Sequence, residues 1–491
     1  MSTPDAAVAT PDPRRWVALA VLLIANFMNL IDVTIVNVAL PSMRDGLGAT
    51  DAQIEWVVAA YILAFALGLL PFGRLGDIVG RSRMFMWGMA AFTAASALCG
   101  LSPNIEFLIF ARVLQGLGGA MMAPQVLAIA TVTFPPNERG QAFSLFGLSA
   151  GLASVCGPIL GGVLIEAQLF GFDWEPIFLV NVPIGIAALV AAWFLIPRLP
   201  GHPSLSNDFV GIALSAIGLV LVVFPIVEGR AYGWPLWAFA MIAAGVVVLG
   251  IFVFWTARRA REGKPQLLNH DLITNRDYMF GALVITIYAS GIPGMFMVIS
   301  LLLQAGFDFT PLQSGLTNAP FSVGVLIASF IAGRFGNRYL RSRLATAATL
   351  LTLGIGALHF IVAAVTDTID AWWFLPPLLV AGVGLGLGFS SLFQLVLRNV
   401  PPRDAGAGSG ALQAFQQIGG AVGVALVGEI FFTRLANGFA GGASQHAAFA
   451  DATALALWYQ VVSFAIVLLL VPFFRRGGQD RPAAAPVVVE A

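Results

Sequence analysis

The sequence predicts an all-α integral membrane protein with fourteen transmembrane helices, arranged as two six-helix bundles plus two inserted helices. Three observations predict this fold. Hydrophobic residues make up 58% of the 491 residues and charged residues only 10%, whereas a soluble protein has about 25% charged residues. Apolar runs of helical length recur along the whole chain, and a segment of its first half returns in its second half. A chain this apolar cannot cover a water-exposed surface, so its solvent must be the lipid bilayer.

Fourteen apolar runs are long enough to cross about 30 Å of hydrocarbon as a helix, which takes about 20 residues. Continuous runs of this length argue against a membrane β-barrel, in which polarity would alternate at every second residue. The runs cover approximately residues 16–40, 52–72, 84–101, 105–131, 141–165, 176–197, 209–227, 235–256, 278–303, 312–333, 345–366, 371–397, 407–431 and 455–474.

The basic residues indicate how these helices are oriented. If the N-terminus is cytoplasmic, 21 of the 25 Lys and Arg residues fall in cytoplasmic segments, and three, Arg44, Arg230 and Arg434, fall on the opposite side. The remaining one, Arg112, lies within a span. Because short cytoplasmic loops collect basic residues, we expect a multi-pass protein of the cytoplasmic (inner) membrane with both termini in the cytoplasm.

An internal repeat divides the chain. The segment GRLGDIVGRSR at 73–83 returns as GRFGNRYLRSR at 333–343, and PPNERG at 135–140 is echoed by PPRDAG at 401–406. The two offsets agree in aligning helices 1 to 6 with helices 9 to 14, so helices 7 and 8 are an insertion. The predicted domains are a cytoplasmic tail at 1–15, an N-terminal six-helix bundle at 16–197, a linker with two extra transmembrane helices at 198–277, a C-terminal six-helix bundle at 278–474 and a cytoplasmic tail at 475–491.

The composition gives no support for a metal centre, a nucleotide site or a nucleic-acid partner. The two cysteines and four histidines lack metal-ligand spacing. The glycine-rich run at 381–389 has neither a strand before it nor a lysine after it, so it is not a phosphate loop. Equal numbers of acidic and basic residues, 25 of each, give a formal net charge of zero, which favours no polyanion. We therefore expect no metal, no cofactor and no nucleic acid.

Several segments resemble motifs of the major facilitator superfamily. The run at 73–81 is similar to the superfamily's signature between helices 2 and 3, 111–120 to its fourth-helix motif, and 151–162 to its antiporter motif in helix 5. The runs at 30–41 and 177–185 resemble the fourteen-helix drug:proton antiporters, although Glu175 follows Trp174 where that subfamily commonly has a basic residue. The resemblance implies two bundles that rock about a site near the membrane midplane, driven by the proton gradient without a cofactor.

One acid and one base are predicted at matching depth in the membrane. Asp32 and Arg112 lie about eight and about seven residues from the outer ends of their helices, which is roughly 10 to 12 Å at about 1.5 Å per residue. An intramembrane charge is costly unless it is paired or hydrated, so we expect the two to face each other in the N-terminal bundle. Our hypothesis is that movement of the cation relative to the carboxylate makes proton affinity depend on conformation. A purely structural ion pair is the alternative.

Two helices carry polar stripes suited to a wet cavity. In the first helix polar residues follow at steps of three, and in the thirteenth three glutamines precede a second candidate acid. The resemblance to the drug:proton antiporters implies that acids in this helix can serve protons or cationic substrates. Packing hydrogen bonds between helices would explain the amides equally well, and a glutamate that simply reaches interfacial water would explain the acid. The stripes consist of Asn26, Asn29 and Asp32 in the first helix and Gln413, Gln416, Gln417 and Glu429 in the thirteenth.

The loop after the second helix is the predicted cytoplasmic gate. It lies some 30 Å from the outer charge pair by span length, so Asp77 cannot bind the same substrate. Its glycines permit a tight turn, and Asp77 can pair with a basic residue such as Arg81 or Arg139, or cap a helix end, in the outward-open state only; a fixed topology determinant is the alternative. Asn337 replaces this acid in the repeat, so we expect an asymmetric gate. The gate residues are Gly73, Gly76, Asp77, Gly80, Arg81 and Arg139.

The fifth helix has a smooth flank of small residues that allows close contact with a neighbouring helix. Close packing alone would explain the glycines, whereas a bend at the proline favours a moving gate. The residues of this antiporter motif are Gly151, Gly157, Pro158, Gly161 and Gly162.

Together these features predict a proton-coupled antiporter that exports amphipathic drug-like small molecules by alternating access, and not an enzyme. The alternatives are a dedicated exporter of a single metabolite in the same fold and, from a different class, a membrane-embedded enzyme or lipid flippase, for which the sequence shows no catalytic cluster. We expect a monomer in the lipid bilayer whose partners are protons and the small-molecule substrate, and we leave an accessory periplasmic partner open.

Overall fold

A computed structural model of the chain describes residues 13–168, 171–201, 208–229, 232–335, 338–365, 368–398, 400–401 and 405–474. All regular structure in these residues is helical. The helices are α1 (Arg15–Leu47), α2 (Asp51–Val79), α3 (Arg81–Gly100), α4 (Ile105–Thr133), α5 (Pro136–Glu166), α6 (Pro176–Leu179), α7 (Asn181–Leu195), α8 (Phe209–Glu228), α9 (Leu236–Arg261), α10 (His270–Thr274), α11 (Arg276–Ser290), α12 (Pro293–Leu301), α13 (Pro311–Phe335), α14 (Leu340–Ala363), α15 (Leu375–Leu397), α16 (Ala405–Ala440) and α17 (Gln445–Leu470).

Within the described residues, twelve helical segments are long and apolar enough to cross a membrane. The chain is therefore a multi-pass helical membrane protein. Two further long helices, α3 and α5, are not among these segments, so the count of fourteen spans stays a prediction. The twelve segments are Arg15–Val36, Trp56–Val79, Ile105–Thr133, Pro176–Leu195, Phe209–Ile226, Leu236–Arg261, Arg276–Gly306, Gln313–Phe335, Leu340–Ala363, Ala371–Leu397, Ala407–Ala440 and Gln445–Phe473.

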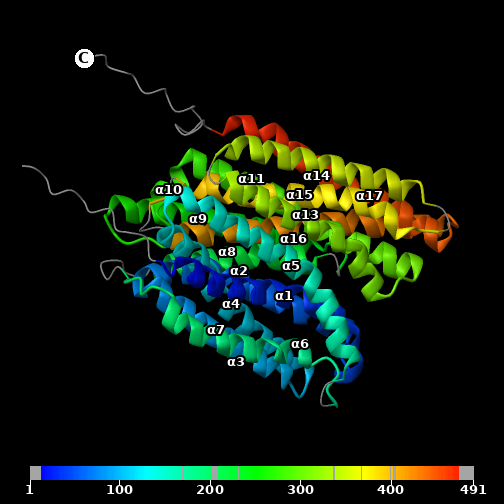
Figure 1. Cartoon of the computed structure of the whole chain (residues 1–491), viewed down its shortest axis with the longest axis horizontal. Helices are drawn as coiled ribbons and strands as arrows, with labels where there is room; N and C mark the ends of the chain where they lie inside the picture. Colours follow the sequence, from blue (N-terminus) through cyan, green and yellow to red (C-terminus); the bar gives the residue numbers. More distant parts are fainter. Residues whose placement is uncertain are drawn as a thin grey trace, which may run out of the picture.

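The long helices run roughly side by side in two groups. The first group is α1 to α7 and the second is α11 to α17; α1, α3, α4 and α7 lie in one part of the molecule, and α14, α15 and α17 lie in the other (Figure 1). Two helices join the groups: α5 packs on both α1 and α13, and α16 packs on α11 and α17 as well as on α2 and α4. Movement of one group against the other must therefore pass through the α5–α13 and α2–α16 contacts.

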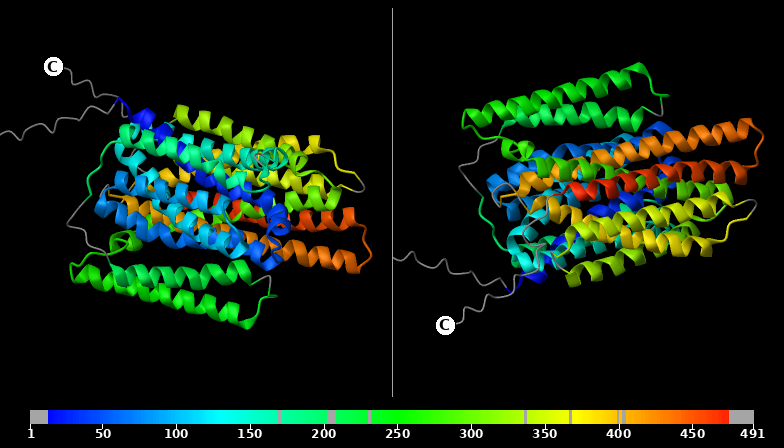
Figure 2. Two further views of the ribbon diagram at one scale, coloured as in Figure 1. Left: turned by 90° about the horizontal axis from the view of Figure 1, so that it is seen from below. Right: turned by 90° about the horizontal axis from the view of Figure 1, so that it is seen from above.

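Helices α8 and α9 form a pair of their own along one flank, drawn in green in Figure 2. Helix α8 packs on α2 and α16, one helix from each group, and the rings of Phe224 and Trp56 lie 5.7 Å apart. The outer face of α9 is strongly exposed, with Val247 at 61% and Phe254 at 70%. Exposed apolar side chains on a membrane helix are solvated by lipid, so α9 faces the bilayer.

Two predicted spans are interrupted. The predicted helix at 176–197 consists of α6 and α7, separated at Val180. Pro183 contributes to this break because it has no N–H to donate to the carbonyl four residues earlier. The predicted helix at 278–303 likewise divides into α11 and α12, and Pro293 stands at the first position of α12, where its missing N–H costs no hydrogen bond.

The start of α1 and the end of α17 lie at the same end of the molecule (Figure 1), which we call the terminal end. There, Arg15 donates from Nε and Nη2 to the two carboxylate oxygens of Glu138 at 2.8 and 2.9 Å, which joins α1 to the start of α5. Arg341 of α14 donates to the carbonyl of Pro472 at 2.8 Å. The opposite end, with the turn between α1 and α2, we call the distal end.

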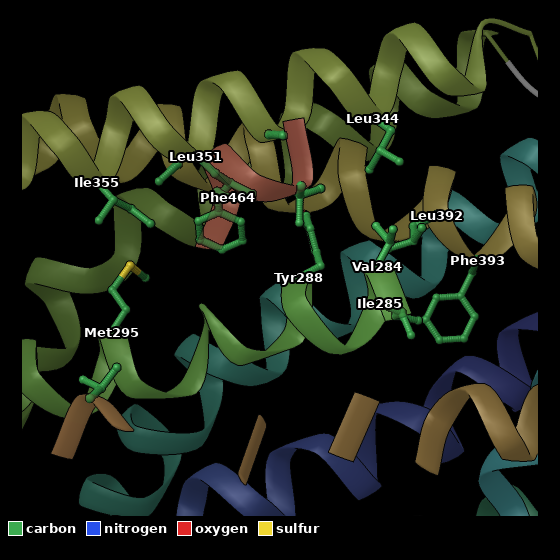
Figure 3. Close-up of a cluster of buried hydrophobic side chains, with 14 of the residues drawn as sticks. Val284, Ile285, Tyr288, Met295, Leu344, Leu351, Ile355, Leu392, Phe393 and Phe464 are labelled. Atoms are coloured by element: carbon green, nitrogen blue, oxygen red, sulfur yellow. The ribbon is translucent and has the colours of Figure 1, made fainter. Parts of the chain in front are cut away.

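The second group of helices closes around an apolar core (Figure 3). In it, Tyr288 of α11 and Phe464 of α17 meet edge to face with ring centroids 5.5 Å apart. Gly388 of α15 lies against the Tyr288 ring, and any Cβ at this glycine would overlap the phenol. The labelled members of the core are Val284, Ile285, Tyr288, Met295, Leu344, Leu351, Ile355, Leu392, Phe393 and Phe464.

Candidate functional site

A buried ion pair lies between α1 and α4. Nη1 of Arg112 donates to Oδ2 of Asp32 at 2.5 Å, and the two residues are 1% and 0% exposed. The pairing expected from their matching depth is therefore found in the structure, whereas its role in proton coupling stays a prediction. Neither group reaches solvent in this conformation.

Two amides complete the cluster. Gln115, one turn after Arg112 on α4, donates to Oδ1 of Asp32 at 2.7 Å and to the hydroxyl of Ser96 at 2.9 Å, and its carbonyl accepts from Arg112 at 2.6 Å. Asn181, the first residue of α7, donates to Oδ1 of Asp32 at 3.3 Å. Buried charged groups need hydrogen-bond partners in place of water, and these amides give Oδ1 of the carboxylate two donors, while Arg112 serves Oδ2.

The guanidinium has its own anchors, apart from the carboxylate. Nε of Arg112 donates to the carbonyl of Val57 at 2.9 Å. Its Cζ lies 4.3 Å from the ring centroid of Tyr61 and 5.6 Å from that of Phe178. Aromatic faces attract cations, and more so in a desolvated site. Arg112 is thus held by α2 and α6 as well as by Asp32.

The other polar residues of the α1 stripe bind neighbouring helices. Asn29 donates to the carbonyl of Gly119 at 3.5 Å and accepts from the hydroxyl of Tyr61. Asn26 donates to the hydroxyl of Ser149 on α5 at 3.2 Å. The stripe therefore ties α1 to α2, α4 and α5 in this conformation, which is compatible with either a packing role or a cavity wall that opens later.

The predicted gate acid reaches across to the other group of helices. Asp77, 1% exposed, accepts from Nε of Arg81 at 3.1 Å and, through its other oxygen, from the backbone N–H of Ala407 at 3.2 Å. Ala407 lies in the first turn of α16, where backbone N–H groups have no partner within the helix. Arg139, the other expected partner, donates instead to the carbonyl of Phe134 at 3.0 Å.

The gate glycines allow close approach of backbone. Gly80 joins α2 to α3 with φ at +105°, and the carbonyl of Leu199 would lie 2.8 Å from any Cβ there. Gly76 lies against the amide of Gln125, which a Cβ would overlap, and Gly73 is buried in α2. A side chain at Gly80 would be strained as well as crowded.

The antiporter-motif glycines on α5 face two different partners. A Cβ at Gly157 would overlap the hydroxyl of Thr34 on α1, whereas one at Gly151 would lie 2.7 Å from Cγ1 of Val325 on α13. Gly161 is buried, and a Cβ at Gly162 would have no neighbour within 4 Å. The side chain of Pro158, on which the expected bend depends, lies outside the described residues. Gly157 thus brings α5 close to α1 of the first group, and Gly151 brings it close to α13 of the second group.

A buried charge pair in one group of helices and a carboxylate that bridges both groups are the main polar features of the fold. Residues 22–210 and 207–424 match the family model of the Major Facilitator Superfamily. The chain belongs to the Major Facilitator Superfamily.

Named relatives agree with this assignment. The "Probable actinorhodin transporter" of Streptomyces coelicolor is 41% identical over 439 residues, which cover 88% of this chain and 76% of the relative. The "Puromycin resistance protein pur8" of Streptomyces alboniger is 33% identical over 95% of this chain and 91% of its own. The solved human organic anion transporter MFSD10 shares the fold, with a TM-score of 0.64 at 15% identity over 94% of this chain and all of that structure. The protein is therefore a superfamily transporter of the drug efflux type, not an enzyme.

In this superfamily member the glutamine stripe of α16 is only partly buried. The side-chain nitrogen of Gln413 is shielded from solvent and has no hydrogen-bond partner among the described residues. One turn before it, a Cβ at Gly410 would lie 2.6 Å from the carbonyl of Leu69 on α2. Gln416 and Gln417 follow it on the same helix. The stripe therefore begins next to the contact between α2 and α16.

The structure ties Glu429 to the turn between α8 and α9. This exposed carboxylate accepts from Nε1 of Trp234, in the turn between α8 and α9, at 3.1 Å and from the hydroxyl of Thr433 at 3.1 Å. None of these partners belongs to the charge pair or to the glutamine stripe. Among the predicted site residues, Asp32 and Arg112 are thus brought into contact, while Glu429 has a separate set of neighbours.

Within the described part of the transporter, no group of three or more His, Cys, Asp or Glu side chains could hold a metal ion. Besides Tyr61 and Cys99, which flank the cluster, the polar residues that the sequence analysis did not select as site residues include Gln115, Ser96 and Asn181. Gln115 had a usable signal, because it stands three residues after Arg112 and must share its helix face. Ser96 and Asn181 gave no such signal, because their contact with the pair depends on how α3 and α7 pack.

Proposed function

We propose that this transporter is a proton-coupled antiporter that exports amphipathic drug-like small molecules across the cytoplasmic membrane by alternating access. The supporting observation is the fully buried Asp32–Arg112 pair, a titratable group that must be exposed by a conformational change before it can exchange a proton. Relatives named for transport of, or resistance to, individual antibiotics support the substrate class.

In this proposal Asp32 carries the transported proton. When the distal side opens, the carboxylate takes up a proton and loosens its ion pair with Arg112, and when the terminal side opens it releases the proton. A membrane potential of about 100 mV supplies about 2.3 kcal/mol for each charge moved, so each proton supports a modest drug gradient. Glu429 is a second candidate acid, at the distal end of α16, for protons or cationic substrates.

The terminal end is the proposed cytoplasmic side, with both termini there. Asp77 then acts as the cytoplasmic latch. Its hydrogen bond to the backbone of α16 holds the two groups together and so favours the conformation that is closed on the cytoplasmic side. Opening toward the cytoplasm breaks this bond. Gly73, Gly76 and Gly80 keep the approach close, Arg81 orients the carboxylate, and Arg139 is a candidate partner in another conformation.

We extend the proposal to the architecture. Helices α3 and α5 complete fourteen spans, because α3 packs along α4 and α7 and α5 packs along α1 and α13. The bundles at 16–197 and 278–474 rock against each other, the segment at 198–277 is an insertion, and 1–15 and 475–491 are cytoplasmic tails. The polar stripes of α1 and α16 line the path of the substrate. The transporter works as a monomer in the lipid bilayer without a cofactor, and the requirement for an accessory periplasmic partner is open to test.

The first test is Asp32→Asn, measured in proteoliposomes with an imposed pH gradient and a fluorescent amphipathic drug. Asparagine keeps the size of the side chain but cannot take up the proton, so we expect gradient-driven export to fall to the level seen with a protonophore, while drug binding remains. The matched control is Asp45→Asn, which removes an exposed carboxylate from the distal part of the same helix and should export normally. Gradient-driven export by Asp32→Asn at the wild-type rate would refute the coupling role.

A dedicated exporter of a single metabolite remains the second candidate, favoured by the relative named for actinorhodin transport alone. Resistance measured in an efflux-deficient host against a panel of chemically unrelated drugs separates the two functions. Protection against several of them supports the broad exporter, and protection against one compound only supports the dedicated one.

A further inference from the structure

Asn181 contacts the Asp32 carboxylate from a helix that contributes nothing else to the charge pair. It is 1% exposed and is the first residue of α7, directly after the break at Val180. Among the described residues, its one side-chain hydrogen bond is the donation to Asp32 at 3.3 Å. Helix α7 itself is fixed against α3 at Gly185, where any Cβ would overlap the hydroxyl of Thr93. The backbone of Asn181 is thus held in place, while its amide contacts a group that is proposed to change charge.

A change of protonation alters what Asp32 requires of its neighbours. The carboxylate accepts three donors, from Arg112, Gln115 and Asn181. A protonated carboxyl group also has one O–H to donate, and this donor needs an acceptor. The Gln115 carbonyl already accepts from Arg112 and from Cys99. Asn181 is the remaining amide, and a half-turn about its χ2 exchanges its N–H₂ for its carbonyl, a two-fold torsion with a soft profile.

We propose that Asn181 is a positioning residue that holds Asp32 in both protonation states. Its Nδ2 donates to the carboxylate, and after a half-turn its Oδ1 accepts from the protonated carboxyl group. The proton itself arrives from water on the distal side and leaves to the terminal side, and the amide neither gains nor loses one. This inference rests on the proposed function, because it requires Asp32 to be the proton carrier.

A change of pH profile caused by substituting Asn181 can be attributed to Asp32, because, among the described residues, few other ionisable groups lie near this carboxylate. The ionisable groups that face the cluster are Arg112 from α4, Tyr61 from α2 and Cys99 from α3. Within the described residues, no ionisable side chain of α5, α6 or α7 bonds to Asp32. Hydrogen bonds to a charged group are roughly twice as strong as neutral ones, so the loss of the amide harms the carboxylate more than the protonated acid. Proton uptake should then occur at higher pH.

The test compares Asn181→Leu and Asn181→Ser by the pH profile of gradient-driven export in proteoliposomes. We expect half-maximal export by Asn181→Leu to move up by about one pH unit, the size of one lost hydrogen bond to a charged group. Asn181→Ser should return toward the wild-type profile, since a hydroxyl both donates and accepts. Thr131→Val is the control, because among the described residues this hydroxyl bonds to the carbonyl of Leu127 on its own helix and not to the charge pair, and its profile should be unchanged.

Two outcomes would overturn the inference: a wild-type pH profile for Asn181→Leu, or an equal shift for Asn181→Leu and Asn181→Ser. If Asn181→Leu does not give monodisperse protein, Asn181→Ala carries the same expectation. Parallel measurement of Asp32→Asn separates the two levels of the argument. If Asp32→Asn loses gradient-driven export while Asn181→Leu keeps the wild-type profile, only the inference fails; if Asp32→Asn keeps export, the proposed function fails with it.

Discussion

Two glycines of the same motif on α5 differ in the space around them: a side chain would have no room at one and ample room at the other. At Gly157 a Cβ would overlap the Thr34 hydroxyl, which itself donates to the carbonyl of Ala153 at 3.1 Å. Five residues later, at Gly162, a Cβ would have no neighbour within 4 Å. The two glycines belong to the same run of sequence, so only the packing of α1 on α5 distinguishes them.

We predict that Gly157→Ala lowers the stability of the protein by about 1–3 kcal/mol, because overpacking a tight helix contact forces backbone or side chains to shift. Gly162→Ala should change it by about 0.5 kcal/mol or less, since the new methyl group meets nothing. Thermal unfolding of the two purified proteins in the same detergent measures the difference. Equal melting temperatures would show that α1 and α5 are not packed closely at this position.

Among the helices, the end of α2 and the start of α16 meet across the two groups through a charged side chain, Asp77. An acidic side chain near a helix N-terminus is stabilised by the helix dipole, typically by about 0.3–1 kcal/mol at exposed sites and more when partly buried. Beside it, Ser409 of α16 donates to the carbonyl of Pro124 on α4 at 3.2 Å. Both bonds depend on the two groups being close at the terminal end.

We predict that Asp77→Asn shifts the transporter toward the conformation open at the terminal end and reduces turnover, because the amide keeps its size but loses its charge toward α16. Spin labels placed on the two groups at the terminal end should show a longer distance than in the wild type. Asp271→Asn, which changes an exposed acid on α10, serves as the control. Wild-type turnover together with an unchanged distance would remove the latch.

For the molecule as a whole, the pair of helices α8 and α9 adds a third body to the two groups. Helix α8 packs on one helix of each group, and the turn after it is attached to α16 by the Trp234–Glu429 hydrogen bond. Any rocking of α2 against α16 must therefore slide along α8 or carry it along. The attachment lies at the distal end, far from the Asp77 contact.

We predict that Trp234→Phe loosens the turn between α8 and α9 while the fold is retained, because phenylalanine keeps an aromatic ring but lacks the indole N–H that Glu429 accepts. Hydrogen exchange of peptides that contain Trp234 should become faster, with a loss of stability of about 1 kcal/mol or less, typical of one exposed hydrogen bond. Trp237→Phe keeps the Trp234 bond and should leave these peptides unchanged. If these peptides exchange at the same rate in Trp234→Phe as in the wild type, the attachment of the turn to Glu429 is contradicted.

Much of the fold could be predicted from the sequence because each helix that spans the membrane needs a long apolar run. The helical segments that are long and apolar enough to cross a membrane all coincide with predicted helices. The superfamily assignment agrees with the motif at 73–81. The interruptions at Val180 and before Pro293 were not predicted, since hydropathy reports the length of an apolar run and not whether its backbone hydrogen bonds are continuous.

The candidate site was predictable only in its charges. Asp32 and Arg112 are conspicuous inside apolar runs, and burial in lipid leaves such groups few options other than each other. The uncharged partners Ser96 and Asn181 could not be found, since small polar residues are common in membrane helices and only the packing decides which meet the pair. The partner of Glu429 could not be predicted either, because Trp234 lies 195 residues earlier in the chain and only the packing brings the two together.

The independent anchoring of Arg112 has an electrical consequence. The Val57 carbonyl, the Gln115 amide and the Tyr61 ring all hold the guanidinium without help from Asp32. If the carboxylate is neutralised by a proton, as proposed, the cation keeps these three anchors, and the charge pair changes from neutral to singly positive inside the bilayer. The membrane potential then exerts a force on the protein itself. For an uncharged drug, the return of the proton-loaded carrier, rather than the movement of the drug-loaded one, should therefore be the voltage-sensitive half of the cycle.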